Sequence, residues 1–269
     1  MRMRAAVLGS PISHSLSPLL HQTAFSYLGI DGSYDRIEVR SGELANFIES
    51  QGKNYDYLSL TMPLKEEVIE LGIPLSEIAL KSRSANTLIN REDVWSATST
   101  DGIGFISALA HRNFSDFTSV LILGAGGTAR AVAAALDGVA QSITILGRTT
   151  SREKAFADII SLSQFSYILW SNSFDLSQFS LVVNTTPAGA ADALAESAVA
   201  EPAGLFFDVI YKPWPTVLAT RWQSLNAPVI AGVELLIYQG IEQLRQAIEI
   251  DFNTEELAEN LREQLQLTP

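Results

Sequence analysis

The feature that most constrains this fold is a glycine-rich turn near the middle of the chain. Residues 120–130 read VLILGAGGTAR, so a short apolar run leads into glycines and then into residues that favour a helix. Gly124, Gly126 and Ala129 match the G-x-G-x-x-G/A spacing, in which missing side chains let a pyrophosphate reach the N-terminus of a helix. The spacing therefore predicts a Rossmann-type unit that binds a dinucleotide.

The 119 residues before position 120 predict a second domain, which is the natural candidate for holding a substrate. The chain has 269 residues, 47% hydrophobic and 18% charged, enough for two globular cores. Apolar runs closed by turn residues predict strands at 5–9, 34–39, 55–61, 85–90 and 94–98. Helices are expected at 17–28, 43–49 and 63–71. In the first of them we expect Ser17 to be the N-cap, with Leu20, Ala24, Tyr27 and Leu28 on the apolar face.

From position 102 the pattern becomes a regular alternation of strands and helices. Strands are expected at 120–123, 142–146, 167–170, 181–184, 205–210 and 228–231, and helices at 128–137, 151–162 and 216–224. This rhythm is typical of a doubly wound parallel sheet. An alanine-rich run at 188–203 is expected to be a surface loop with a short helix. Helices at 234–248 and 254–265, the latter capped by Asn253 or Thr254, end the sequence.

We therefore predict an α/β protein with two domains. Residues 1–101 would form an α/β substrate-binding and catalytic domain, completed by C-terminal helices within 237–269. Residues 102–236 would form the Rossmann-type dinucleotide domain.

Charge and composition exclude several classes of partner. The net charge of −12 argues against nucleic acid and anionic membrane surfaces, which need a basic face. The chain has no cysteine, and its three histidines lack metal-site spacing, so we expect no metal. A signal sequence and long apolar segments are missing, so we expect a cytoplasmic protein, and either a monomer or a homodimer is compatible with the sequence.

The choice between NAD and NADP is made after the second strand of a Rossmann unit, where a carboxylate would bind the ribose of NAD. Here the sequence is Gly147-Arg148-Thr149, without a carboxylate. Arg148 can hold a 2′-phosphate with its planar guanidinium, helped by the Thr149 hydroxyl, which favours NADP. The alternative is that Arg148 is a solvated turn residue.

Three polar segments in the first hundred residues suggest a ligand site. Residues 9–18 contain four serines just before a predicted helix, a pattern that can bind a carboxylate without a cation. Lys65 follows a strand and a proline turn in SLTMPLK. Asp101, in STDGIGF, would cap the helix that opens the second domain, or face a cleft between the domains.

Taken in order, SPISHSLSP, SLTMPLK, SANT, STDGIGF, GAGGTAR and DVIYKPWPT resemble the shikimate dehydrogenase family along essentially the whole chain. The resemblance implies NADP-dependent, reversible interconversion of shikimate and 3-dehydroshikimate in aromatic amino-acid biosynthesis. It implies Lys65 and Asp101 as the catalytic acid–base pair. The implied substrate-binding residues are Ser15, Ser17, Thr61, Asn86, Tyr211 and Gln239. The implied cofactor-binding residues are Glu77, Gly124, Ala125, Gly126, Gly127, Thr128, the segment from Gly147, Arg148 and Thr149 to Arg152, Val209 and Gly232.

Some positions depart from this family pattern. Ser59, Ser99 and Gly147 stand where many members have asparagine, and Leu235 stands where methionine is usual. Three other functions stay open from the sequence: a quinate/shikimate dehydrogenase that uses NAD, a catalytically silent ligand-binding regulator on the same scaffold, and a methylenetetrahydrofolate-type dehydrogenase. An acidic residue near 147 would favour the first, and loss of Lys65 or Asp101 the second.

Overall fold

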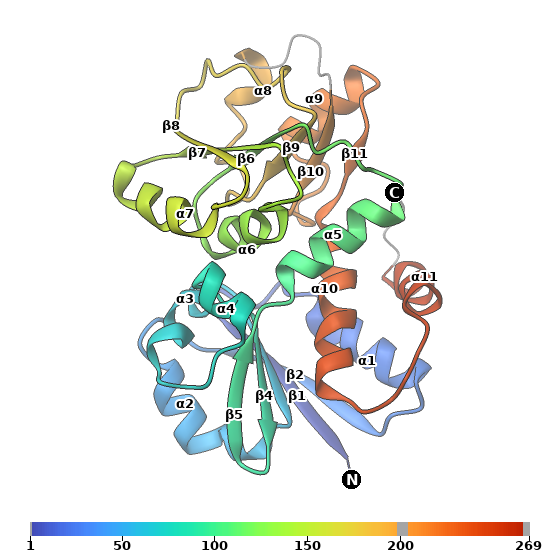
Figure 1. Ribbon diagram of the computed structural model, residues 1–269. Helices are drawn as coiled ribbons and strands as arrows, with labels where there is room; N and C mark the ends of the chain where they lie inside the picture. Colours follow the sequence, from blue (N-terminus) through green and yellow to red (C-terminus); the bar gives the residue numbers. More distant parts are fainter. Residues whose placement is uncertain (1, 198–203, 266–269) are drawn as a thin grey trace. The chain divides into compact units, whose positions relative to one another are not determined.

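The computed structural model describes residues 2–197 and 204–265, and the chain divides into two compact units (Figure 1). The first unit contains Met1–Gly104 and Leu236–Pro269, and the second contains Phe105–Leu235. Two helices belong partly to each unit, namely α5 (Asp101–His111) and α10 (Gly232–Ala247). The architecture is α/β in both units, as the alternation of strands and helices predicts.

The first unit is built on a five-stranded mixed sheet in the order β2-β1-β3-β4-β5. Its parallel strands are β1 (Met3–Gly9), β2 (Gly32–Glu38) and β3 (Tyr57–Leu60), separated in the chain by α1 (Ser17–Tyr27) and α2 (Leu44–Gln51). The antiparallel strands are β4 (Thr87–Arg91) and β5 (Val94–Thr98). Glu92 and Asp93 join β4 to β5 with positive φ angles of 52° and 64°, the left-handed pair that a two-residue hairpin turn requires.

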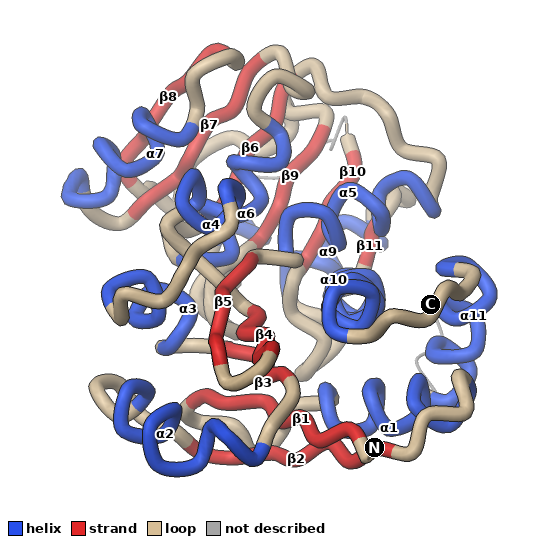
Figure 2. The backbone as a smooth tube through the Cα atoms, turned by 60° about the horizontal axis from the view of Figure 1, so that its bottom comes forward, coloured by secondary structure: helices blue, strands red, loops and turns tan. Residues whose placement is uncertain are grey.

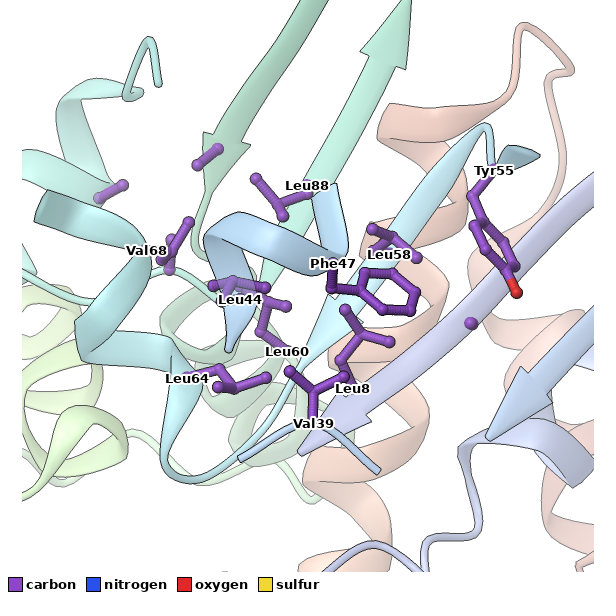
Figure 3. Close-up of a cluster of buried hydrophobic side chains, with 14 residues drawn as sticks. Leu8, Val39, Leu44, Phe47, Tyr55, Leu58, Leu60, Leu64, Val68 and Leu88 are labelled. Carbon is purple, nitrogen blue, oxygen red and sulfur yellow. The ribbon is translucent and has the colours of Figure 1, made fainter. Parts of the chain in front are cut away.

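A buried apolar cluster lies between one face of this sheet and the helix α2 (Figure 3). Leu8, Leu58 and Leu60 reach it from the strands, and Leu44 and Phe47 reach it from α2. Because side chains alternate along a strand, Tyr57 and Ser59 point to the opposite face of the sheet. This alternation decides which residues of β3 can take part in polar chemistry there.

Short helices complete the first unit. They are α3 (Leu64–Glu67), α4 (Glu77–Ser82) and the 3₁₀ turns Gly52–Asn54 and Val68–Glu70. The sequence reading did not predict α4, whose start is capped by the Ser76 hydroxyl accepting from the Ala79 N–H. The last helix, α11 (Thr254–Gln264), starts at the predicted cap Asn253 and packs beside α1 (Figure 2).

The predicted start and apolar face of α1 are partly wrong. The N-cap position is Leu16, and Ser17 is the first helical residue. The Ser17 N–H donates to the Ser15 hydroxyl at 3.3 Å, so Ser15 supplies the acceptor at the helix start. Tyr27 is 47% exposed, while His21 and Phe25 are buried. The helical period of 3.6 residues carries position 27 out of the stripe that contains positions 17, 20, 21, 24 and 25.

His21 is enclosed between α1 and the sheet. Its ring stacks on Tyr34 with centroids 4.2 Å apart, and its Nδ1 lies 2.8 Å from the Tyr57 hydroxyl. Burial lowers the pKa of His21 from 6.5 to about 3, and a side-chain interaction with Gln243 opposes this shift. The folded protein therefore holds a neutral imidazole there.

This histidine makes folding stability depend on pH. As the pH falls from about 7 to about 5, the unfolded imidazole binds a proton and the folded one does not, so the protein is expected to lose about 2 kcal/mol of unfolding free energy. The variant His21→Gln should lack this component, and the variant His14→Gln, which changes an exposed histidine, should keep it. Urea unfolding at the two pH values measures the difference; an equal loss in His21→Gln and the parent protein would contradict the assignment.

The second unit contains a six-stranded parallel sheet in the order β11-β10-β9-β6-β7-β8. The strands are β6 (Ser119–Leu123), β7 (Ser142–Gly147), β8 (Gln164–Leu169), β9 (Leu181–Asn184), β10 (Leu205–Asp208) and β11 (Val229–Ile230). The helices are α6 (Gly127–Leu136), α7 (Glu153–Ile159), α8 (Leu194–Ser197) and α9 (Val217–Ser224), with a 3₁₀ turn at Thr150–Arg152. The chain reverses its direction of growth between β6 and β9, the place where such sheets bind ligands at the carboxyl ends of their strands.

The alanine-rich segment is less superficial than predicted. Ala191, Leu194 and Ala195 are buried in a cluster with Trp222 of α9. Residues 198–203 of the same predicted segment lie outside the described residues. The apolar alanine side chains here pack against α9, since α8 and α9 are in contact.

Candidate active site

Lys65 and Asp101 form an ion pair within the first unit. Lys65 is the second residue of α3, and Asp101 is the first residue of α5. The Lys65 Nζ lies 2.5 Å from Asp101 Oδ2, with side chains only 17% and 4% exposed. Shielding from water strengthens such a contact. The structure therefore joins two residues that are 36 positions apart in the sequence.

Asn86 and Gln239 complete a cluster around this pair. Asn86 Nδ2 donates to Asp101 Oδ1 at 2.8 Å, to Thr100 Oγ1 at 2.9 Å and to Gln239 Oε1 at 3.1 Å. Asn86 Oδ1 accepts from the Thr100 N–H at 2.8 Å, which fixes the backbone just before α5. Four of the residues named from the sequence, Lys65, Asn86, Asp101 and Gln239, are thus brought together.

A glycine permits the approach of the two helices that carry Asp101 and Gln239. A Cβ added at Gly104 of α5 would meet the backbone nitrogen and Cα of Gln239 in α10. The backbones touch here because residue 104 has no side chain. The STDGIGF motif thus contributes both the carboxylate and the close packing that places Gln239 beside Asn86.

The serine-rich segment lies next to the loop that leads to Lys65. The Ser10 N–H donates to the Met62 carbonyl at 3.0 Å, and a side chain at Gly9 would collide with Thr61. Ser15 and Ser17 are both largely buried at the start of α1. These hydroxyls and Thr61 therefore belong to neighbouring segments of the same unit.

Arg36 is a polar residue near this segment that the sequence reading missed. Its Nη2 donates to the backbone carbonyl of Ser15 at 2.6 Å. It places a guanidinium beside the serines in a protein with a net charge of −12. Its position in β2 has no motif around it, so only the register of β2 beside β1 could have revealed it.

The glycine-rich turn has the geometry that a dinucleotide needs. Gly124 follows β6 with φ of +102°, and a Cβ there would meet the Thr185 hydroxyl. A Cβ at Gly126 would meet nothing within 4 Å, so the backbone before α6 is open to a ligand. Ala129 is fully buried, which allows α6 to pack closely. Ala125, Gly127 and Thr128 lie in the same turn and first helical residues.

The segment after β7 is exposed and held by a tyrosine. Arg148, Thr149 and Arg152 are exposed, and the Tyr167 hydroxyl of β8 donates to the Thr149 carbonyl at 2.7 Å. A side chain at Gly147 would collide with the Tyr167 ring and hydroxyl. The departure from asparagine at 147 thus has a structural reason, because Tyr167 fills that space.

Val209 and Gly232 are in direct backbone contact. A Cβ at Gly232 would overlap the Val209 carbonyl, and the Gly232 N–H donates to the Ile210 carbonyl at 3.3 Å. The preceding Asp208 is fully buried and accepts from Thr216 Oγ1 at 2.7 Å, Asn184 Nδ2 at 3.1 Å and the Ile210 N–H at 3.0 Å. Burial raises the pKa of Asp208, while these hydrogen bonds lower it in part.

Two residues named from the resemblance lie in a different unit from their expected partners. Glu77 is the first residue of α4 and is exposed in the first unit, whereas the glycine-rich turn is in the second. Tyr211 is partly buried in the second unit, whereas Lys65 and Asp101 are in the first. Their roles stay predictions.

Residues 2–197 and 204–265 contain no cluster of three or more histidine, cysteine, aspartate or glutamate side chains suited to a metal ion. In the same ranges, none of the helices combines the length and apolar character needed to cross a bilayer.

Comparison with known proteins identifies the family. Residues 7–88 match the family model described as the shikimate dehydrogenase substrate binding domain. The NADP(+) shikimate dehydrogenase of Staphylococcus aureus strain MSSA476 is 32% identical over 251 residues, covering 90% of this chain and 91% of the relative. The crystal structure of Mycobacterium tuberculosis shikimate dehydrogenase matches with a TM-score of 0.86 and 30% identity, over 97% of this chain and 99% of that one. The Thermus thermophilus enzyme in complex with NADP(H) and shikimate matches with a TM-score of 0.83 and 28% identity, over 97% and 99%. This chain belongs to the shikimate dehydrogenase family.

Proposed function

We propose that this chain catalyses the reversible, NADP-dependent interconversion of 3-dehydroshikimate and shikimate. The observation that carries the proposal is the enclosed Lys65–Asp101 pair, held by Asn86 and Gln239, in a member of this family. Oxidation of a secondary alcohol needs a group that accepts the hydroxyl proton while hydride leaves the carbon. Lys65 and Asp101 supply that acid–base pair in the proposed reaction.

The first unit is proposed to bind the substrate. The hydroxyls of Ser15 and Ser17, with the Arg36 guanidinium behind the Ser15 carbonyl, suit the carboxylate of shikimate. Thr61, Asn86 and Gln239 are proposed to contact its other polar groups. Tyr211 is proposed to act at the carboxylate end. Because Asn86 already donates to Asp101, its role includes holding that carboxylate.

The second unit is proposed to bind NADP, whose nicotinamide supplies the hydride acceptor when bound. The open backbone at Gly126 and the positive φ of Gly124 fit the pyrophosphate. Arg148, Thr149 and Arg152, all exposed after β7, fit the 2′-phosphate. Val209 and Gly232 are proposed to line the nicotinamide end, and Glu77 is proposed as a further cofactor contact. Cytoplasmic location and assembly as a monomer or homodimer stay part of the prediction.

Steady-state oxidation of shikimate and of quinate, each with NADP and with NAD, tests the proposal. We expect turnover of shikimate with NADP at a kcat/KM well above that of the other three combinations. Absence of shikimate turnover with either cofactor would refute the proposed function. Comparable rates with quinate and NAD would instead favour a broader quinate/shikimate dehydrogenase.

A further inference from the structure

A buried hydrogen-bond network in the first unit leads to the Lys65–Asp101 pair from residues without a role in the proposed function. It starts at Ser59 of β3, whose side chain points away from the apolar cluster of Figure 3. The Ser59 hydroxyl accepts from the Tyr34 hydroxyl at 2.6 Å and donates to Gln243 Oε1 at 2.8 Å. Both Ser59 and Gln243 are almost completely buried.

Gln243 uses its whole side-chain amide in this network. Its Nε2 donates to the backbone carbonyl of Asn86 and to Thr87 Oγ1, each at 3.0 Å. Its Oε1 accepts from Ser59. With two N–H donors and one acceptor engaged, the orientation of the amide is determined, because the reverse orientation would set donor against donor. The Asn86 carbonyl also accepts from the Leu60 N–H at 2.8 Å.

Gln239 and Gln243 are one turn apart on α10, so they lie on the same face of the helix. Together they hold Asn86 at two points: Gln239 accepts from its side-chain amide, and Gln243 donates to its backbone. Asn86 then donates to Asp101. The neighbouring Ala85 N–H donates to the Lys65 carbonyl at 2.9 Å, so the same stretch also anchors Lys65.

We propose that Gln243 is a positioning residue for the Lys65–Asp101 pair. It fixes the backbone at Asn86, and Asn86 in turn orients the Asp101 carboxylate toward Lys65. This role rests on the proposed function, in which that pair moves the substrate proton. Ser59 supports Gln243 through its hydrogen bond to Oε1, and neither residue contacts the pair itself through a hydrogen bond that the described residues show.

The test is the variant Gln243→Met, which keeps the length of the side chain and removes its hydrogen bonds. We expect kcat for shikimate oxidation to fall about 10- to 100-fold, as for a small displacement of a reacting group, with the KM for NADP within about twofold of the parent. Gln246→Met is the matched control on the same helix, since Gln246 bonds only to Glu242 in the described contacts, and its kinetics should not change. Thr87→Val, which removes one acceptor of Gln243, should lower kcat in the same direction and serves if Gln243→Met does not fold.

A second readout does not need turnover. NMR titration of the Asp101 carboxyl, assigned with Asp101→Asn, should differ between the parent and Gln243→Met and should be unchanged in Gln246→Met. An unaltered titration together with parental kcat in Gln243→Met would overturn the positioning role, even if its unfolding free energy fell. If the parent protein itself does not oxidise shikimate, the proposed function fails, and the titration alone then decides whether Gln243 positions Asp101.

Discussion

Lys65→Ala is expected to lower kcat for shikimate oxidation by about 100-fold or more, the usual loss when a general acid–base group is removed. The KM for NADP should change little, because Lys65 lies in the first unit and the glycine-rich turn lies in the second. The physical reason is its 2.5 Å contact with a carboxylate that is only 4% exposed. No other cation is expected to replace Lys65 at that contact. Steady-state kinetics at saturating cofactor measure the effect.

The matched control is Lys53→Ala, which removes an exposed lysine from the same unit and should leave kcat unchanged. Asp101→Asn keeps the shape of the side chain and removes its charge, and it should cost a similar factor in kcat. The double variant should lose little more than either single variant, because residues that act as one unit are not additive. A kcat for Lys65→Ala within about twofold of the parent would refute its role.

Arg148→Gln is expected to raise the KM for NADP about 10- to 100-fold and to leave the KM for NAD nearly unchanged. A hydrogen bond to a charged group contributes about 1.5 to 3 kcal/mol, which corresponds to that range. The residue is exposed directly after β7, at the carboxyl edge of the parallel sheet where such folds bind cofactors. Glutamine keeps hydrogen-bonding capacity and removes the charge.

Arg112→Gln is the control for this change of charge. Arg112 is an exposed arginine of the second unit that precedes β6, at the amino edge of the same sheet. Its removal should leave both cofactor constants unchanged. Equal KM values for NADP in Arg148→Gln and the parent would show that Arg148 is a solvated turn residue, the alternative that the sequence leaves open.

Local patterns in the sequence were sufficient for most of the architecture. The glycine spacing at Gly124 and Gly126 and the alternation of apolar runs predict the Rossmann-type unit, because turn chemistry and strand or helix periodicity act over a few neighbouring residues. The same locality explains the errors. The N-cap of α1 moved from Ser17 to Leu16 because a hydrogen bond from Ser17 to Ser15 competes there. The burial of Ala191 and Ala195 depends on α9, which no local pattern predicts.

The candidate site divides in the same way. Lys65 and Asp101 were named from motifs, and their approach across 36 positions depends on the placement of α3 and α5. Arg36, Ser59 and Gln243 were missed, since none of them belongs to a motif. Ser59 and Gln243 are 184 positions apart, and their hydrogen bond exists only because the C-terminal helix α10 packs onto the first sheet on the face that Ser59 shares.

By itself, therefore, the sequence determined the class of fold, the dinucleotide turn and the chemical types of the candidate site residues, all of which depend on short-range preferences of the backbone. Only the tertiary structure decided which of those residues meet. A hydrogen bond needs its donor and acceptor within about 3 Å of each other. That precision arises when helices and strands from distant parts of the chain pack against one another, as α10 does when it holds Asn86 through Gln239 and Gln243.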